Sequence, residues 1–70
     1  MTVTLDTIIS DVINEDINAA KVFFESGMYC AGGPSSAGES IQQAAAVHGI
    51  DAQELVKNLN NYFAAKNIMA

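Results

Sequence analysis

Apolar side chains recur at helical spacing near the start of the chain, at Leu5, Ile8, Ile9, Val12 and Ile13. Residues three and four positions apart share one face of an α-helix, so this spacing favours an amphipathic helix over a strand. Asp6 or Thr7 stands where a side-chain cap would satisfy the first amides. The pattern predicts a short helix over roughly residues 7–14.

A second apolar stripe follows the polar turn Asn14–Asp16, at Ile17, Ala20, Phe23 and Phe24. Gly27 comes just after this stripe, where a glycine in the left-handed conformation commonly ends a helix. Met28 then follows as the apolar residue that packs back onto the helix. We expect Phe23, Phe24 and Phe63 in the core, and Asp11, Glu15, Asp16 and Glu25 on solvated helix faces or in first turns.

The third predicted helix has signals at both of its ends. Ser40 and Gln43 have the spacing of a capping box, in which each residue bonds the backbone of the other. The helix then runs to His48, and Gly49 closes it. Ile50 is placed to fold back onto the helix as the apolar residue of a Schellman motif.

The fourth predicted helix opens on a second capping-box pattern, Asp51 to Glu54. Its expected core face consists of Leu55, Val56, Leu59, Tyr62 and Phe63. Residues 1–4 alternate too briefly to predict a strand. The fold class is therefore all-α, with four short helices in an irregular array and a loop of small residues between the second and third.

Length and charge limit the possible functions. With 70 residues, the chain makes one small domain, residues 1–70, without room for a second core. Three lysines, no arginine and eight carboxylates give a net charge of −5, which argues against nucleic acid or anionic lipid as a partner. No apolar run approaches the ~20 residues of a membrane span, and no secretory signal opens the chain. We expect a cytoplasmic protein; the composition leaves its oligomeric state open.

The segment from Gly27 to Gly38 contains the only cysteine, the only proline and four of the five glycines. A lone Cys30 excludes an intramolecular disulfide. Cys30 is the candidate catalytic thiol, since small neighbours would leave it accessible and nearby amides would favour the thiolate. The alternative is a packing role, because free cysteine is among the most buried residue types. Met28 and Tyr29, which flank the thiol, could line a recognition surface around it.

His48 is a possible accessory group for Cys30, although a histidine at a helix C-terminus is also well placed against the last carbonyls. One cysteine and one histidine fall short of the ligands that zinc or an iron–sulfur cluster needs, so we expect no metal and no cofactor. Gly33–Ser40 has the spacing of a phosphate-binding loop. Glu39 stands in place of its lysine, however, and would repel phosphate.

Ser40 suggests a function from another class. Gly38–Ile41 resembles the segment of acyl carrier proteins in which a serine at the start of the second helix carries phosphopantetheine. Glu39 replaces the usual aspartate, and the alanine-rich helix that follows lacks the acidic residues that usually dock partners. Helix capping accounts for Ser40 without any modification.

Three segments together resemble one family of small domains: Phe23–Gly32, Ser40–Ala45 and His48–Asp51. They are similar, in order and spacing, to the hybrid-cluster-protein-associated redox disulfide domain family. The likeness spans most of the chain, from about Leu5 to Tyr62. It implies a shared fold and the position of Cys30 in a loop.

The family pattern implies a second cysteine where this chain has Gly33. Cys30 therefore has no resolving thiol for a dithiol–disulfide cycle. We expect a binding or accessory module, with no stand-alone enzyme activity, that presents the loop of Met28, Tyr29, Cys30, Gly32 and Gly33 to a protein partner. By the resemblance, this partner belongs to redox or iron–sulfur metabolism. The alternatives are a monothiol redox domain, in which Cys30 forms mixed disulfides, and an acyl carrier modified on Ser40.

Overall fold

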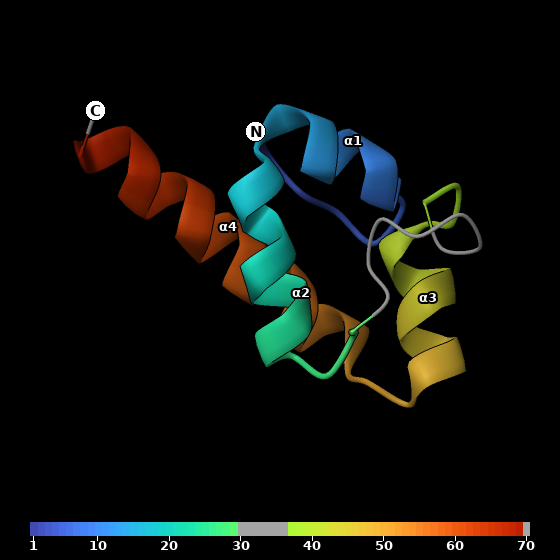
Figure 1. Ribbon diagram of the computed structural model, residues 1–70. Helices are drawn as coiled ribbons and strands as arrows, with labels where there is room; N and C mark the ends of the chain where they lie inside the picture. Colours follow the sequence, from blue (N-terminus) through green and yellow to red (C-terminus); the bar gives the residue numbers. More distant parts are fainter. Residues whose placement is uncertain (30–36, 70) are drawn as a thin grey trace.

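The computed structural model describes residues 1–29 and 37–69, which form four α-helices and one short 3-10 helix (Figure 1). The elements are α1 (Ile9–Glu15), η1 (Ile17–Ala19), α2 (Ala20–Glu25), α3 (Ile41–His48) and α4 (Ala52–Met69). In Figure 1, α1 crosses the top of the molecule, α3 lies at one side, and α4 runs past α2 toward the C-terminus at the other. The predicted all-α class is confirmed. None of the helices in these two described stretches is long and apolar enough to cross a membrane.

The start of α1 differs from the prediction, because neither Asp6 nor Thr7 caps it. Ile8 occupies the N-cap position and makes no side-chain cap. Instead, the amides of Ile9 and Ser10 donate to carbonyl oxygens of residues 39 and 37, at 3.0 and 2.9 Å. The Thr7 hydroxyl is used locally and accepts from the Thr4 amide at 2.8 Å. Backbone from a distant part of the chain satisfies the first turn, so the helix begins at Ile9.

The first turn of α3 is satisfied by the segment that leads into α1. The amides of Ile41 and Gln42 donate to the carbonyl oxygens of Thr7 (2.9 Å) and Leu5 (3.0 Å). An isolated antiparallel bridge pairs Ile8 with Ser40 at the centre of this contact. The segment before each helix thus supplies carbonyl acceptors to the first amides of the other helix. These amides would otherwise have to bond to water or to side chains.

Side chains and glycine complete α3 as the sequence predicts. The Ser40 hydroxyl accepts from the Gln43 amide (3.1 Å), and the Gln43 side chain accepts from the Ser40 amide (3.0 Å). At the other end, Gly49 has φ +69°, and the Ile50 amide donates to the Ala45 carbonyl at 2.9 Å. These bonds define a capping box and a Schellman motif.

The end of α2 repeats the Schellman motif around Gly27, which has φ +101°. The Met28 amide donates to the Phe23 carbonyl at 2.9 Å, and the Gly27 amide donates to the Phe24 carbonyl at 3.0 Å. Met28 is only 1% exposed, so the residue after the glycine anchors the turn in the core. The predicted termination of this helix is confirmed.

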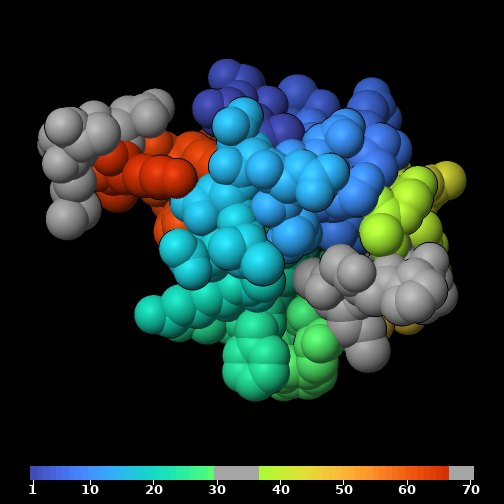
Figure 2. Space-filling view, turned by 45° about the horizontal axis from the view of Figure 1, so that its top comes forward, coloured from blue at the N-terminus to red at the C-terminus, as the bar shows by residue number. Residues whose placement is uncertain are grey.

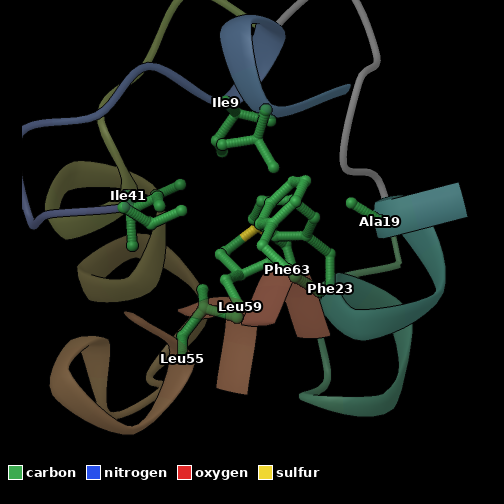
Figure 3. Close-up of a cluster of buried hydrophobic side chains, with 11 residues drawn as sticks. Ile9, Ala19, Phe23, Ile41, Leu55, Leu59 and Phe63 are labelled. Carbon is green, nitrogen blue, oxygen red and sulfur yellow. The ribbon is translucent and has the colours of Figure 1, made fainter. Parts of the chain in front are cut away.

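A single apolar cluster joins all the helices: Val3, Ile9, Val12, Ala19, Phe23, Met28, Ile41, Ala44, Leu55, Leu59 and Phe63. Figure 3 shows Phe23 and Phe63 in its middle, with Ile9 on one side and Leu55 and Leu59 on the other. Val56 and Tyr62 are half-buried and pack against this cluster. The core residues predicted on the fourth helix therefore all lie in or against the core.

Phe24, which the sequence analysis expects in the core, is on the surface, and so is Ile17 of the same apolar stripe. Ile17 is 73% exposed and Phe24 is 59% exposed. Ile17 lies in η1, which buries Ala19 and leaves Ile17 outside. Phe24 follows Phe23 directly, and neighbouring positions on a helix lie about 100° apart, so the short α2 buries only the first of the two rings.

Polar contacts hold α4 at its start and at its middle. At its start, the Asp51 carboxylate accepts from the amides of Gln53 (3.0 Å) and Glu54 (3.3 Å), which confirms Asp51 as a cap. Farther along, the Asn60 side chain accepts from the Val3 amide (2.8 Å) and donates to the Val3 carbonyl (3.0 Å). One side-chain amide thus fastens the N-terminal segment to α4.

Gly27→Ala should lower the free energy of unfolding by about 1–2 kcal/mol, because alanine is strained at positive φ. A methyl group there would lie 3.7 Å from Cδ1 of Ile50, an ordinary contact, so the backbone conformation sets the cost. Urea unfolding measures it. The matched control is Gly38→Ala, at a glycine with open space around it, which should change stability by less than about 0.5 kcal/mol. Equal stability of the two variants would contradict the Schellman geometry at Gly27.

Asn60→Ala should destabilise the fold by about 1–3 kcal/mol, because it leaves the amide and carbonyl of Val3 without partners in a partly buried position. Hydrogen exchange at the Val3 amide should accelerate more than exchange in α3. The exposed neighbour Asn61, changed to alanine, is the control and should have little effect. Unchanged exchange at Val3 in Asn60→Ala would show that the clamp contributes nothing.

Candidate functional site

An exposed pair of aromatic rings marks the end of α2. The rings of Phe24 and Tyr29 pack edge to face, with centroids 4.8 Å apart and planes at 71°. Phe24 is 59% exposed and Tyr29 is 70% exposed. In Figure 2, the green residues of this part of the chain form the lower edge of the molecule. We call Phe24 and Tyr29 the aromatic pair.

The local backbone fixes the aromatic pair in place. Phe24 sits in the last turn of α2, the left-handed Gly27 reverses the chain, and the buried Met28 ties the reversal to the core. Tyr29 is the next residue, so its ring returns against Phe24. Met28 is itself removed from the predicted recognition surface, because a side chain that is 1% exposed anchors the turn and cannot contact a partner.

The structure brings together two of the segments that carried the family resemblance. Gly27 faces the side chain of Ile50, so the turn after α2 lies against the turn after α3. His48 occupies the last position of α3 and is exposed. Cys30, Gly32 and Gly33, the remaining predicted site residues, lie outside the described residues. Tyr29 is thus the predicted loop residue that the structure places on the surface.

Ser40 is engaged by α3 and by α1. Its hydroxyl accepts from the Gln43 amide, and its backbone pairs with Ile8. Both its side chain and its main chain therefore have structural partners. This is the capping role that its spacing predicts.

The sequence did not reveal a polar cluster around a buried Asp16. One oxygen, Oδ2, accepts from the Tyr62 hydroxyl (2.6 Å) and from Lys66 Nζ (2.7 Å). The other, Oδ1, accepts from the Asn18 amide at 3.0 Å and caps η1. The side chain is 7% exposed, so the expectation of a solvated helix face is wrong for Asp16, which instead caps the start of η1. The available signal was the spacing of Tyr62 and Lys66, four positions apart on one face of α4.

These hydrogen bonds change how the three groups titrate. The Lys66 ammonium, the Tyr62 hydroxyl and the Asn18 amide stabilise the carboxylate and lower the pKa of Asp16 from 3.8 to about 2. The same carboxylate raises the pKa of Tyr62 and the pKa of Lys66 above their ordinary values. A raised pKa keeps the Tyr62 phenol protonated, so it supplies even less phenolate than an ordinary tyrosine. The cluster is therefore built to hold α4 against η1, and it lacks an activated group.

The described stretches hold no grouping of three or more histidine, cysteine, aspartate or glutamate side chains that could bind a metal ion. The Asp16 cluster has a single carboxylate, which an ammonium and a hydroxyl already occupy. Among the described residues, Ile17 and Val47 are also exposed apolar side chains, at 73% and 75%, but the aromatic pair combines two exposed rings in direct contact.

Stability should fall as the pH drops from about 4 toward about 2, because Asp16 binds a proton in the unfolded chain before it does so in the folded one. The stabilisation is present above the unfolded pKa and disappears as the pH passes through the folded value. Urea unfolding across this range should show a steeper loss for the native chain than for Asp16→Asn. Asp11→Asn, at an exposed carboxylate, is the control. If the free energy of unfolding fell equally with pH in the native chain and in Asp16→Asn, the lowered pKa of Asp16 would be contradicted.

Comparison with known proteins gives the family. The sequence profile described as "Domain of unknown function (DUF1858)" matches residues 3–56. A protein of Clostridium thermocellum, target CmR9 of the Northeast Structural Genomics Consortium, has an NMR solution structure with 53% sequence identity to this chain. The two superpose with a TM-score of 0.89 over 100% of both chains. No curated protein matches. The chain therefore belongs to the DUF1858 family of domains of unknown function.

Proposed function

We propose that this domain is a binding module that docks a protein partner through the aromatic pair and presents the segment beginning at Cys30 to it. The observation that carries the proposal is the exposure of Phe24 and Tyr29 on a fixed turn. The other phenylalanines, Phe23 and Phe63, are 0% and 4% exposed, so Phe24 is the phenylalanine that remains available to a partner. Aromatic side chains that remain exposed on a rigid backbone are the usual anchors of protein interfaces.

The geometry suits docking. The two rings already pack against each other, and the Schellman turn fixes the backbone between them. The aromatic pair and its turn therefore lose little conformational entropy when a partner binds. Cys30 follows Tyr29 directly, so whatever contacts the aromatic pair comes close to the only thiol of the chain.

The proposed partner is a protein of redox or iron–sulfur metabolism, and the setting is the cytoplasm. Support for this class comes from the resemblance of Phe23–Gly32 and His48–Asp51 to the redox disulfide domains. A lone cysteine also fits a reducing compartment, where thiols stay unpaired. With Gly33 in place of a second cysteine, the proposed role is recognition and not dithiol exchange.

Because Cys30 is the only cysteine, a maleimide–benzophenone probe attaches at one position and can trap a neighbouring protein by photo-crosslinking. The protein it traps is then purified, and its affinity for the unlabelled domain is measured by calorimetry. Phe24→Ser and Tyr29→Ser should each weaken binding at least about tenfold, since truncating an interface anchor typically costs more than ~1.4 kcal/mol. Ile17→Ser, at an equally exposed apolar residue on η1, should leave the affinity unchanged. Full affinity in both aromatic variants would rule out this docking surface.

The role of the thiol needs a separate measurement, which is the rate of Cys30 alkylation against pH. A recognition role predicts an unshifted midpoint near ~8.5 and unchanged partner affinity in Cys30→Ser. A midpoint well below that value, with ready formation of a mixed disulfide with glutathione, would instead favour a monothiol redox domain.

A further inference from the structure

We infer that the element seated on the aromatic pair is a short cationic segment of the partner, with arginine or lysine beside an apolar residue, and not a second copy of this domain. This inference rests on the proposed function and specifies its partner. Three features of the described residues support it: the small area of the patch, the charge around it and the open faces of its rings.

The two rings by themselves offer less area than a stable interface between two folded domains buries. Complete burial of an aromatic side chain removes roughly 150–250 Å² from water. With exposed fractions of 59% and 70%, Phe24 and Tyr29 together offer roughly 200–320 Å². Stable complexes bury about 800 Å² on each partner. Two anchors in so small an area suit a short segment that inserts one or two side chains.

The charge distribution selects a cationic segment. Lys66 is paired with Asp16, so two lysines remain against seven other carboxylates, all of which are exposed or half-buried. Glu25 is exposed next to Phe24, and Asp51 is exposed beside Ile50, the residue that faces Gly27. Lys21, one turn before Phe24, is the cation nearest along α2. Two copies of a chain with net charge −5 repel each other, whereas a basic segment is attracted.

The ring geometry provides a contact for the cation. An edge-to-face pair leaves the negative face of at least one ring open to solvent, and both rings here are mostly exposed. A guanidinium or ammonium group placed over such a face gains a cation–π interaction, while the apolar residue beside it covers the ring edges. The neighbouring Glu25 carboxylate supplies a second contact for the same charge.

Two synthetic peptides test the inference on the intact 70-residue chain, labelled with ¹⁵N. One alternates leucine with arginine, and the other has glutamate in place of every arginine. The arginine peptide should shift the amide resonances of residues 24–29, and the glutamate peptide should not. Phe24→Ser and Tyr29→Ser should each weaken the arginine peptide at least fivefold, Glu25→Gln less, and Ile17→Ser not at all.

The inference is overturned if the arginine peptide leaves residues 24–29 unshifted, if the glutamate peptide binds equally well, or if Phe24→Ser abolishes a dimer seen by sedimentation. These outcomes differ from failure of the proposed function. A crosslinked partner that depends on the aromatic pair but presents an acidic or folded surface would overturn only the cationic segment. A partner indifferent to both rings would overturn the docking site as well.

Discussion

The mutual capping of α1 and α3 is the contact on which the rest of this fold depends. Each helix start turns its orphan amides toward carbonyl groups of the segment that leads into the other, from residues 5 and 7 on one side and 37 and 39 on the other. The exchange fixes the two helices relative to each other with backbone groups alone. It also orients the two helices so that Ile9 and Ile41 point into the core, where both are fully buried. In a chain of this size, with a thin stability margin, an unsatisfied helix start would be a considerable cost.

The long helix α4 completes the structure by fastening the other segments to itself. Leu55, Leu59 and Phe63 supply its apolar contact with the core, and polar side chains of the same helix bind segments far away in the sequence. Asn60 holds the backbone of Val3, while Tyr62 and Lys66 converge on Asp16. The family profile ends at residue 56, so the α4 side chains of these clamps lie beyond the matched region, whereas Val3 and Asp16 lie within it. The Asn60 clamp explains how an N-terminal segment without regular structure is nevertheless buried at Val3.

The proposed docking surface arises because the short α2 can bury only part of its apolar side chains. A helix as short as α2 buries one narrow face, which it gives to Phe23. Phe24 is left outside, and the glycine turn brings Tyr29 back against it. The second Schellman turn, at Gly49 and Ile50, supports the first from the side of α3. The exposed pair is thus held by two helix ends whose geometry is set by glycine.

The sequence by itself determined the features that depend on neighbouring residues: the all-α class, the capping box at Ser40, the glycine turns at Gly27 and Gly49, and the core face of α4. These are local, because spacing and backbone freedom decide them within one or two turns of helix. Tertiary structure alone decided the capping of α1 by residues 37 and 39, the exposure of Ile17 and Phe24, and the burial of Asp16. Each of these depends on a contact with residues far along the chain, or on which side chains of a short helix are the ones that become buried. Local periodicity carries no information about that choice.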